Sequence, residues 1–145
     1  MENCQIGVFL TYASPQGHVM LDRELYLPKA WTDDAARCKD AGIPAERLFA
    51  TQPQCAQQML KRAFDAGVPA AWVAGESVYG DNRSLRMWLE EHQHASVLAV
   101  SGKAYVWRAG RHQPVKTILA TLEAEGWCRL SAGDGAKGPR WYDWR

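Results

Sequence analysis

The residues best suited to chemistry lie around one carboxylate, that of Glu76. It follows the short apolar run 70–75 (AAWVAG) and precedes the sequence SVYG at 77–80. An acid at the carboxyl end of a buried strand occupies the place where α/β domains hold ligands and metals. In phosphoryl transfer, such carboxylates come from separate elements and together bind Mg²⁺ or Mn²⁺. The segment has no second acid, so without partners from elsewhere Glu76 is a solvated or helix-capping residue.

Other acids along the chain have simpler explanations. Asp22 and Glu24 are two residues apart, which places them on one face of an expected strand. Salt bridges with nearby basic residues, Arg23 among them, would account for both. Glu90 and Glu91 indicate a charged helix face.

The glycine-rich segment 133–138 (GDGAKG) superficially resembles a phosphate-binding loop. It lacks the spacing of a P-loop, and no change from strand to helix follows it. Lys137 and Arg140 give this segment two positive charges that can contact a DNA backbone. The alternative is a solvated loop.

Composition indicates a globular domain, with 145 residues, 47% hydrophobic residues and a net charge of +1. The small charge argues against a bulk basic field for nucleic acid, although a local basic strip is compatible with it. We expect a cytoplasmic protein with reduced thiols and no membrane partner, because no signal peptide or membrane-spanning apolar run occurs. The cysteines lack the C-x-x-C spacing of structural zinc sites and are Cys4, Cys38, Cys55 and Cys128.

The elements that must position Glu76 can be predicted from apolar periodicity and end signals. Thr51 and Gln54 form a capping box for the best-marked helix, which Gly67 ends. A strand follows it, and Asp81 or Asn82 caps the next helix. Strands are expected at 5–14, 18–27, 68–74 and 96–100, and residues 104–107 either extend the last of these or form an edge strand. Helices are expected at 32–42, 51–67, 82–92 and 114–126. A hairpin followed by alternating strands and helices predicts an α/β fold with a mixed sheet.

The pattern changes at Cys128. Residues 130–139 look like a loop, and the aromatic run 141–145 (WYDWR) looks like the start of a strand. We therefore expect 128–145 to be the start of a truncated following segment.

Several phrases of the chain resemble the middle of a transposase of the DDE superfamily, encoded by insertion sequences. They are GVFLTYAS at 7–14, DRELYLP at 22–28, WVAGESVYG at 72–80 and SAGDGAKGPR at 131–140. The resemblance covers nearly the whole chain and implies an RNase H-like fold, a mixed five-stranded sheet flanked by helices. Residues 1–145 would then be a partial, incomplete catalytic domain.

The resemblance also implies Mg²⁺-dependent (or Mn²⁺-dependent) cleavage and transfer of DNA strands at transposon ends, by two Asp and one Glu. The second of these acids falls at Glu76, where the family has Asp. The strand bearing the first Asp would precede Gln5, and the third acid would follow Arg145, so neither is in this chain. The resemblance thus implies a transposase fragment that is inactive alone, with Glu76 as its catalytic metal ligand.

Two other functions remain open. One is a non-catalytic DNA-binding or protein-binding module, in which Lys137 and Arg140 would contact DNA. The other is a metal-dependent nuclease completed by a second chain. In each case, the missing central strand would leave an exposed sheet edge, which predicts self-association.

Overall fold

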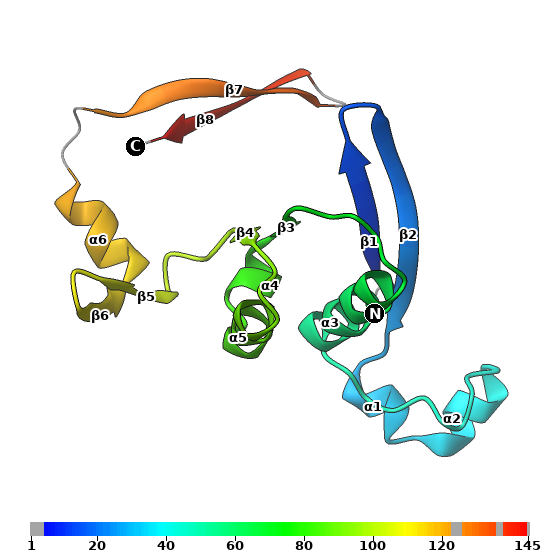
Figure 1. Cartoon of the computed structure of the whole chain (residues 1–145). Coiled ribbons are helices and arrows are strands. Elements are labelled where there is room, and N and C mark those ends of the chain that lie inside the picture. Colours follow the sequence, from blue (N-terminus) through cyan, green and yellow to red (C-terminus); the bar gives the residue numbers. More distant parts are fainter. Residues whose placement is uncertain (1–4, 123–125, 136–137, 145) are drawn as a thin grey trace. The chain divides into compact units, whose positions relative to one another are not determined.

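The computed structural model of the protein describes residues 5–122, 126–135 and 138–144 (Figure 1). The chain divides into two compact units, Met1–Ser101 and Gly102–Arg145. Each unit is a mixture of helices and short strands, so the predicted α/β class is confirmed. Among the described residues, no helix is long and apolar enough to cross a membrane.

The first unit opens with the predicted hairpin, which is confirmed. Strands β1 (Ile6–Ser14) and β2 (Gly17–Tyr26) pair antiparallel along their full length. The register shifts between Leu10 and Thr11, so that Leu21 has no partner and forms a bulge. Every second residue of β1 from Val8 onward is turned inward, as the period of two requires.

Two short helices, α1 (Lys29–Thr32) and α2 (Ala35–Asp40), replace the single helix expected at 32–42. The expected start was wrong because Asp34 caps a new helix: its carboxylate accepts a hydrogen bond from the Arg37 N–H at 2.9 Å. The chain then runs without regular structure to the next helix, apart from turns at 41–42 and 45–46.

Helix α3 (Gln52–Asp65) begins with the predicted capping box. The Gln54 side chain accepts from the Thr51 N–H at 2.8 Å, and the Thr51 hydroxyl accepts from the Gln54 N–H at 3.4 Å. Gly67 follows the helix with φ +74°, the left-handed conformation expected of a helix-ending glycine.

The strand predicted at 68–74 is shorter than expected. Strand β3 covers only Val73–Gly75, and it pairs in parallel with β4 (Ser96–Leu98). The preceding residues lie outside the strand because their amides donate hydrogen bonds to nearby carbonyls. The Val68 N–H donates to the Ala63 carbonyl, and the Ala70 N–H donates to the Val68 carbonyl. Pro69 between them has no N–H to contribute to a ladder.

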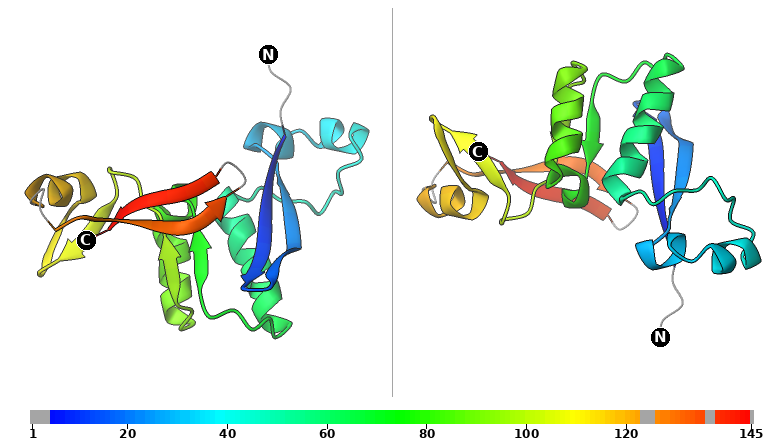
Figure 2. Two further views of the ribbon diagram at one scale, coloured as in Figure 1. Left: turned by 90° about the horizontal axis from the view of Figure 1, so that it is seen from above. Right: turned by 90° about the horizontal axis from the view of Figure 1, so that it is seen from below.

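Helices α4 (Ser77–Gly80) and α5 (Arg83–Glu91) connect β3 to β4. The side chain of Asn82 caps α5 by accepting from the Leu85 N–H at 2.9 Å, which confirms one of the two predicted caps. Helix α3 lies between the β1–β2 hairpin and β3 (Figure 2). Its buried face forms the core of the unit, in two clusters made of Val8, Cys55 and Met59, and of Leu60, Leu85 and Leu89.

The second unit holds two antiparallel hairpins and one helix. Strands β5 (Tyr105–Arg108) and β6 (Arg111–Pro114) form the first hairpin, and helix α6 (Val115–Thr121) follows it. Strands β7 (Cys128–Gly135) and β8 (Gly138–Trp144) form the second.

The loop expected at 130–139 was therefore wrong. Its glycines mark an irregularity within a hairpin: the register shifts between Ser131 and Asp134, and Gly133 has φ +83°. The aromatic run at 141–144 belongs to the second strand of this hairpin.

The described strands form four separate two-stranded sheets. A continuous five-stranded RNase H-like sheet is thus not confirmed for the described residues. In the first unit, an antiparallel pair and a parallel pair flank α3, and no recorded backbone hydrogen bond joins them.

Candidate functional site

Glu76 stands at the carboxyl end of β3, as the sequence predicts. Its backbone is extended, with φ −77° and ψ 175°, and its carbonyl accepts from the N–H groups of Tyr79 and Gly80 at 2.9 and 3.0 Å. Its side chain is exposed and has no hydrogen bond or ion pair with any described residue. It does not cap α4 through its side chain, so the helix-capping alternative is excluded for the side chain. The carboxylate is free to bind a ligand.

The turn after Glu76 is held by close packing and two hydrogen bonds. A Cβ atom at Gly80 would lie 1.8 Å from the carbonyl oxygen of Ala99, so only glycine lets α4 approach the end of β4 this closely. Arg86 donates a hydrogen bond to the Gly80 carbonyl. Asp81 accepts from the Ser101 N–H at 2.9 Å, and this bond lowers the pKa of the Asp81 carboxyl.

Tyr79 is the titratable neighbour of Glu76. Burial raises the pKa of its phenol, and the negative charge of Glu76 raises this pKa further. The phenol is therefore neutral at physiological pH.

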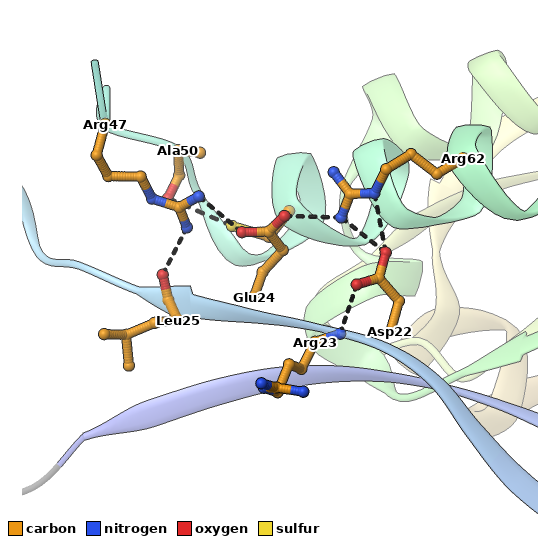
Figure 3. A network of polar contacts seen from close by, with 8 residues as sticks. Asp22, Arg23, Glu24, Leu25, Arg47, Ala50 and Arg62 are labelled. Carbon is orange, nitrogen blue, oxygen red and sulfur yellow. Dashed lines mark hydrogen bonds and ion pairs between the residues drawn. The ribbon is translucent and has the colours of Figure 1, made fainter. Parts of the chain in front are cut away.

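Asp22 and Glu24 are engaged by arginines, as expected, although Arg47 and Arg62 are the partners (Figure 3). Arg62 reaches Asp22 at 2.8 Å and Glu24 at 2.7 Å, and Arg47 reaches Glu24 at 2.6 Å. Arg47 also donates to the Leu25 carbonyl at 2.8 Å. Burial would raise the pKa of each carboxyl, but the arginine hydrogen bonds outweigh it and lower both pKa values.

The described residues do not provide the ligand set of a two-metal site. They contain no group of three or more His, Cys, Asp or Glu side chains arranged to hold a metal ion. Glu76 is an unpaired acid, whereas Asp81 accepts from a backbone amide and the acids of β2 from arginines. This donor set does not fit a pair of Mg²⁺ or Mn²⁺ ions.

An apolar groove separates β1 from β3. It has a volume of about 380 Å³, and its lining includes Tyr12 and Ser14 of β1 together with Pro69 and Trp72 before β3. A smaller pocket continues it toward Gly75 and is lined by Phe9 and Leu10 from the other half of β1. The two strands therefore run in opposite directions along the groove.

The two predicted DNA contacts belong to the second unit. Arg140 lies on β8 with an exposed side chain, and its guanidinium donates to the Ala132 carbonyl at 3.4 Å. Lys137 falls outside the described residues.

Sequence reasoning missed a row of exposed rings on the β5–β6 hairpin. Tyr105 and Trp107 alternate along β5, and His112 lies opposite Trp107 on β6. The alternation of aromatic residues at 105 and 107, beside Arg108, was the available signal.

The sequence segment that contains Glu76 lies within a match to a known protein family. The family model of the DDE superfamily endonuclease matches residues 1–119, which include the whole first unit and the β5–β6 hairpin. No curated protein and no solved structure gave a significant match. Because the match extends over most of its length, this chain belongs to the DDE superfamily endonuclease family.

Proposed function

We propose that the chain is part of a transposase catalytic domain that cleaves and joins DNA at transposon ends, and that it does not cleave DNA alone. The observation that carries the proposal is Glu76, an exposed and unpaired carboxylate at a strand end inside the family match. An acid without a structural partner, held on a rigid turn, is the kind of residue that a ligand site uses.

The inactivity of the isolated chain follows from its donor set. A reactive metal pair needs several carboxylates from separate elements. Glu76 supplies one, and its side chain is a methylene longer than the Asp expected there. A displacement of about 1 Å at a reacting group can cost on the order of a hundredfold in rate, and missing ligands cost more.

Residues 128–145 are proposed to begin a segment that follows the catalytic fold. The family match stops at residue 119, before the β7–β8 hairpin begins at Cys128. Lys137 and Arg140 of this segment are proposed to contact the DNA backbone. Such contacts need positive charge but do not depend on the base sequence.

A nicking assay tests the proposal. The full chain is incubated with supercoiled plasmid and Mg²⁺ or Mn²⁺, beside Glu76→Ala and the double variant Lys137→Gln with Arg140→Gln. We expect no nicking above the background of Glu76→Ala, and salt-dependent DNA binding that the double variant weakens. Nicking by the wild-type chain that Glu76→Ala abolishes would refute the proposed inactivity.

A second candidate, a metal-dependent nuclease completed by another polypeptide, is favoured by the groove between β1 and β3. Each of these strands has a recorded partner on one side, β2 or β4. An extended strand in the groove would pair with both free edges and join the two sheets. Antiparallel pairing is slightly more stable per residue, so the long strand β1 favours an occupant running parallel to β3.

A described strand of a second copy could not fill this position intact. A strand between β1 and β3 needs both edges free, whereas each described strand is already paired along one edge. The occupant would come from a different segment, apolar where it faces Leu10 and Leu60 on the groove lining. Hydrogen exchange of the full chain with and without an uncharged seven-residue peptide of alternating Val and Thr tests this. Slower exchange in β1 shows that a strand enters the groove, which the second candidate requires, and unchanged exchange contradicts this candidate.

A further inference from the structure

An aromatic row covers the outer face of the β5–β6 hairpin. The ring centroids of Trp107 and His112 are 5.2 Å apart, and those of Tyr105 and His112 are 5.1 Å apart. The side chains remain open to solvent, since Trp107 is 74% exposed and Tyr105 is 53% exposed. Val106 and Gln113, on the opposite face, are half-buried. The polypeptide thus exposes the rings on one face of the hairpin.

The β5–β6 hairpin and helix α6 carry side-chain charges of a single sign. Residues 102–122 contain no Asp or Glu, and they contain four cations, namely Lys103, Arg108, Arg111 and Lys116. None of these cations forms an ion pair with a described residue. The positive potential of the row is therefore not neutralised by the described residues, although the whole chain carries only +1.

The hairpin tip brings two of these cations together. Ala109 and Gly110 both have positive φ, 49° and 73°, as in the two-residue turns that match the twist of a hairpin. Arg108 and Arg111 are consequently direct cross-strand partners. Like charges placed opposite each other destabilise a strand pair, and a polyanion between them would remove this cost.

We propose that this surface, Tyr105, Trp107 and His112 with the surrounding cations, binds single-stranded DNA. Aromatic side chains in a positively charged setting bind single strands by stacking on their bases while cations follow the phosphates. The bases of a duplex already stack on each other, so exposed rings that bind by stacking select unpaired bases. A protein partner would need acidic residues for the cations and separate apolar or aromatic side chains for the rings, whereas a single strand carries phosphates and unpaired bases together. The choice of DNA rests on the proposed function, but the surface is distinct from Glu76, Lys137 and Arg140.

The test measures binding of a fluorescent twelve-nucleotide oligo-dT to the full chain by anisotropy. Replacing one stacking ring is expected to weaken binding roughly 5- to 100-fold, so Trp107→Ala should lie in this range and Trp107→Phe should retain most of the affinity. Phe49→Ala is the matched control, because Phe49 is an exposed aromatic residue (41% exposed) of the first unit that does not line the groove between β1 and β3. Its affinity should equal that of the wild type.

The contribution of the cations is tested by the salt dependence of oligo-dT binding. Arg108→Gln should reduce the slope of log affinity against log salt by about 0.7, the value for one phosphate contact on a single strand. Lys39→Gln, an exposed cation on α2, should leave the slope unchanged. Circular dichroism of each variant verifies that it is folded.

The outcomes separate this proposal from the proposed function. Equal losses in Trp107→Ala and Phe49→Ala, or a duplex of the same length bound as tightly as oligo-dT, overturn the single-strand surface. Binding of duplex alone, weakened by Arg140→Gln but not by Trp107→Ala, leaves the transposase assignment standing and overturns this inference. A Trp107-dependent self-association without any affinity for oligo-dT assigns the surface to protein contact and also overturns it.

Discussion

The network around Arg62 provides the sharpest test of the fold, through the substitution Arg62→Met. Methionine keeps an apolar stem of similar length and removes the guanidinium. The loss takes away one of the two arginine partners of Glu24, whose side chain is 13% exposed, and the arginine partner of Asp22. Glu24 keeps Arg47, and Asp22 keeps the Arg23 N–H at 2.8 Å.

The magnitude follows from exposure. A hydrogen bond to a charged group contributes about 1.5–3 kcal/mol when it is shielded from water. Arg62 itself is 50% exposed and Asp22 is 30% exposed, so solvent screening reduces the Asp22 contact to about 0.5 kcal/mol. The contact with the more buried Glu24 should retain about 1.5 kcal/mol. We expect Arg62→Met to lower the free energy of unfolding by about 2 kcal/mol at neutral pH.

Urea unfolding followed by circular dichroism measures this difference, and Lys61→Met is the control. Lys61 pairs with Asp65 on the same helix at 2.6 Å, but both side chains are more than 60% exposed, at 67% and 63%. An exposed pair of this kind contributes about 0.3–0.5 kcal/mol. Equal losses in the two variants would refute the argument that burial of Glu24 makes the Arg62 contacts stronger.

The pH dependence gives an independent check on the same contacts. The folded pKa values of Asp22 and Glu24 lie below their ordinary values of 3.8 and 4.5. A lowered folded pKa contributes stability that is fully present above the unfolded pKa and is lost as the pH falls through the folded value. The difference between wild type and Arg62→Met should therefore be constant above about pH 5.5 and shrink as the pH falls below about 4. A difference that persists unchanged at pH 2 would show that the carboxylates are not its source.

Three further predictions concern packing, capping and association. Gly80→Ala should destabilise the chain by about 2–4 kcal/mol in urea unfolding, because its Cβ would meet the Ala99 carbonyl oxygen, whereas Gly102→Ala, with its nearest atom 4.0 Å away, should change little. Thr51→Ala should cost about 1 kcal/mol by loss of the capping box, and Thr51→Ser should restore most of it; equal stability of the two variants contradicts the capping role. The free edge of β1 should make the chain associate, with a mass by light scattering that rises with concentration, and a monodisperse monomer with cooperative melting counts against this prediction.

The parts of the fold that sequence predicts correctly carry their signals within a few residues. The turn between β1 and β2 is defined by Pro15 and Gly17, and helix α3 by Thr51, Gln54 and Gly67. Each signal acts through hydrogen bonds or backbone angles of its own neighbours. Such elements are determined before tertiary packing is considered.

The incorrect predictions of secondary structure concern segments whose amino-acid composition is compatible with two structures. An apolar run such as 68–74 fits a long buried strand, but the amides of Val68 and Ala70 are bound locally and Pro69 has none, which leaves β3 short. Glycines at 133 and 138 fit a loop or an irregular hairpin equally well, and cross-strand pairing with Trp141 and Tyr142 decides between them. Periodicity describes one strand at a time, so it identifies neither the pairing partner nor the register of a strand.

The candidate site could be predicted only in part, because its position depends on local sequence whereas its partners depend on tertiary structure. The position of Glu76 follows from local sequence, because the apolar run and SVYG place it between a strand and a helix. Whether other acids join it depends on tertiary structure. Asp22 and Glu24 are carboxylates like Glu76, but Arg47 and Arg62 form ion pairs with them.

Some charged side chains of the described residues form ion pairs or hydrogen bonds, and others do not. The contrast between these two sets supports the functional proposals. In the first unit, arginines form ion pairs with the acids of β2, and the Asp81 carboxylate accepts a hydrogen bond from a backbone amide. Glu76 and the cations of β5 and β6 have no such partner among the described residues. Like charges placed opposite each other, as at Arg108 and Arg111, destabilise a strand pair. Ligands are the role proposed for both, cationic for Glu76 and polyanionic for the aromatic hairpin.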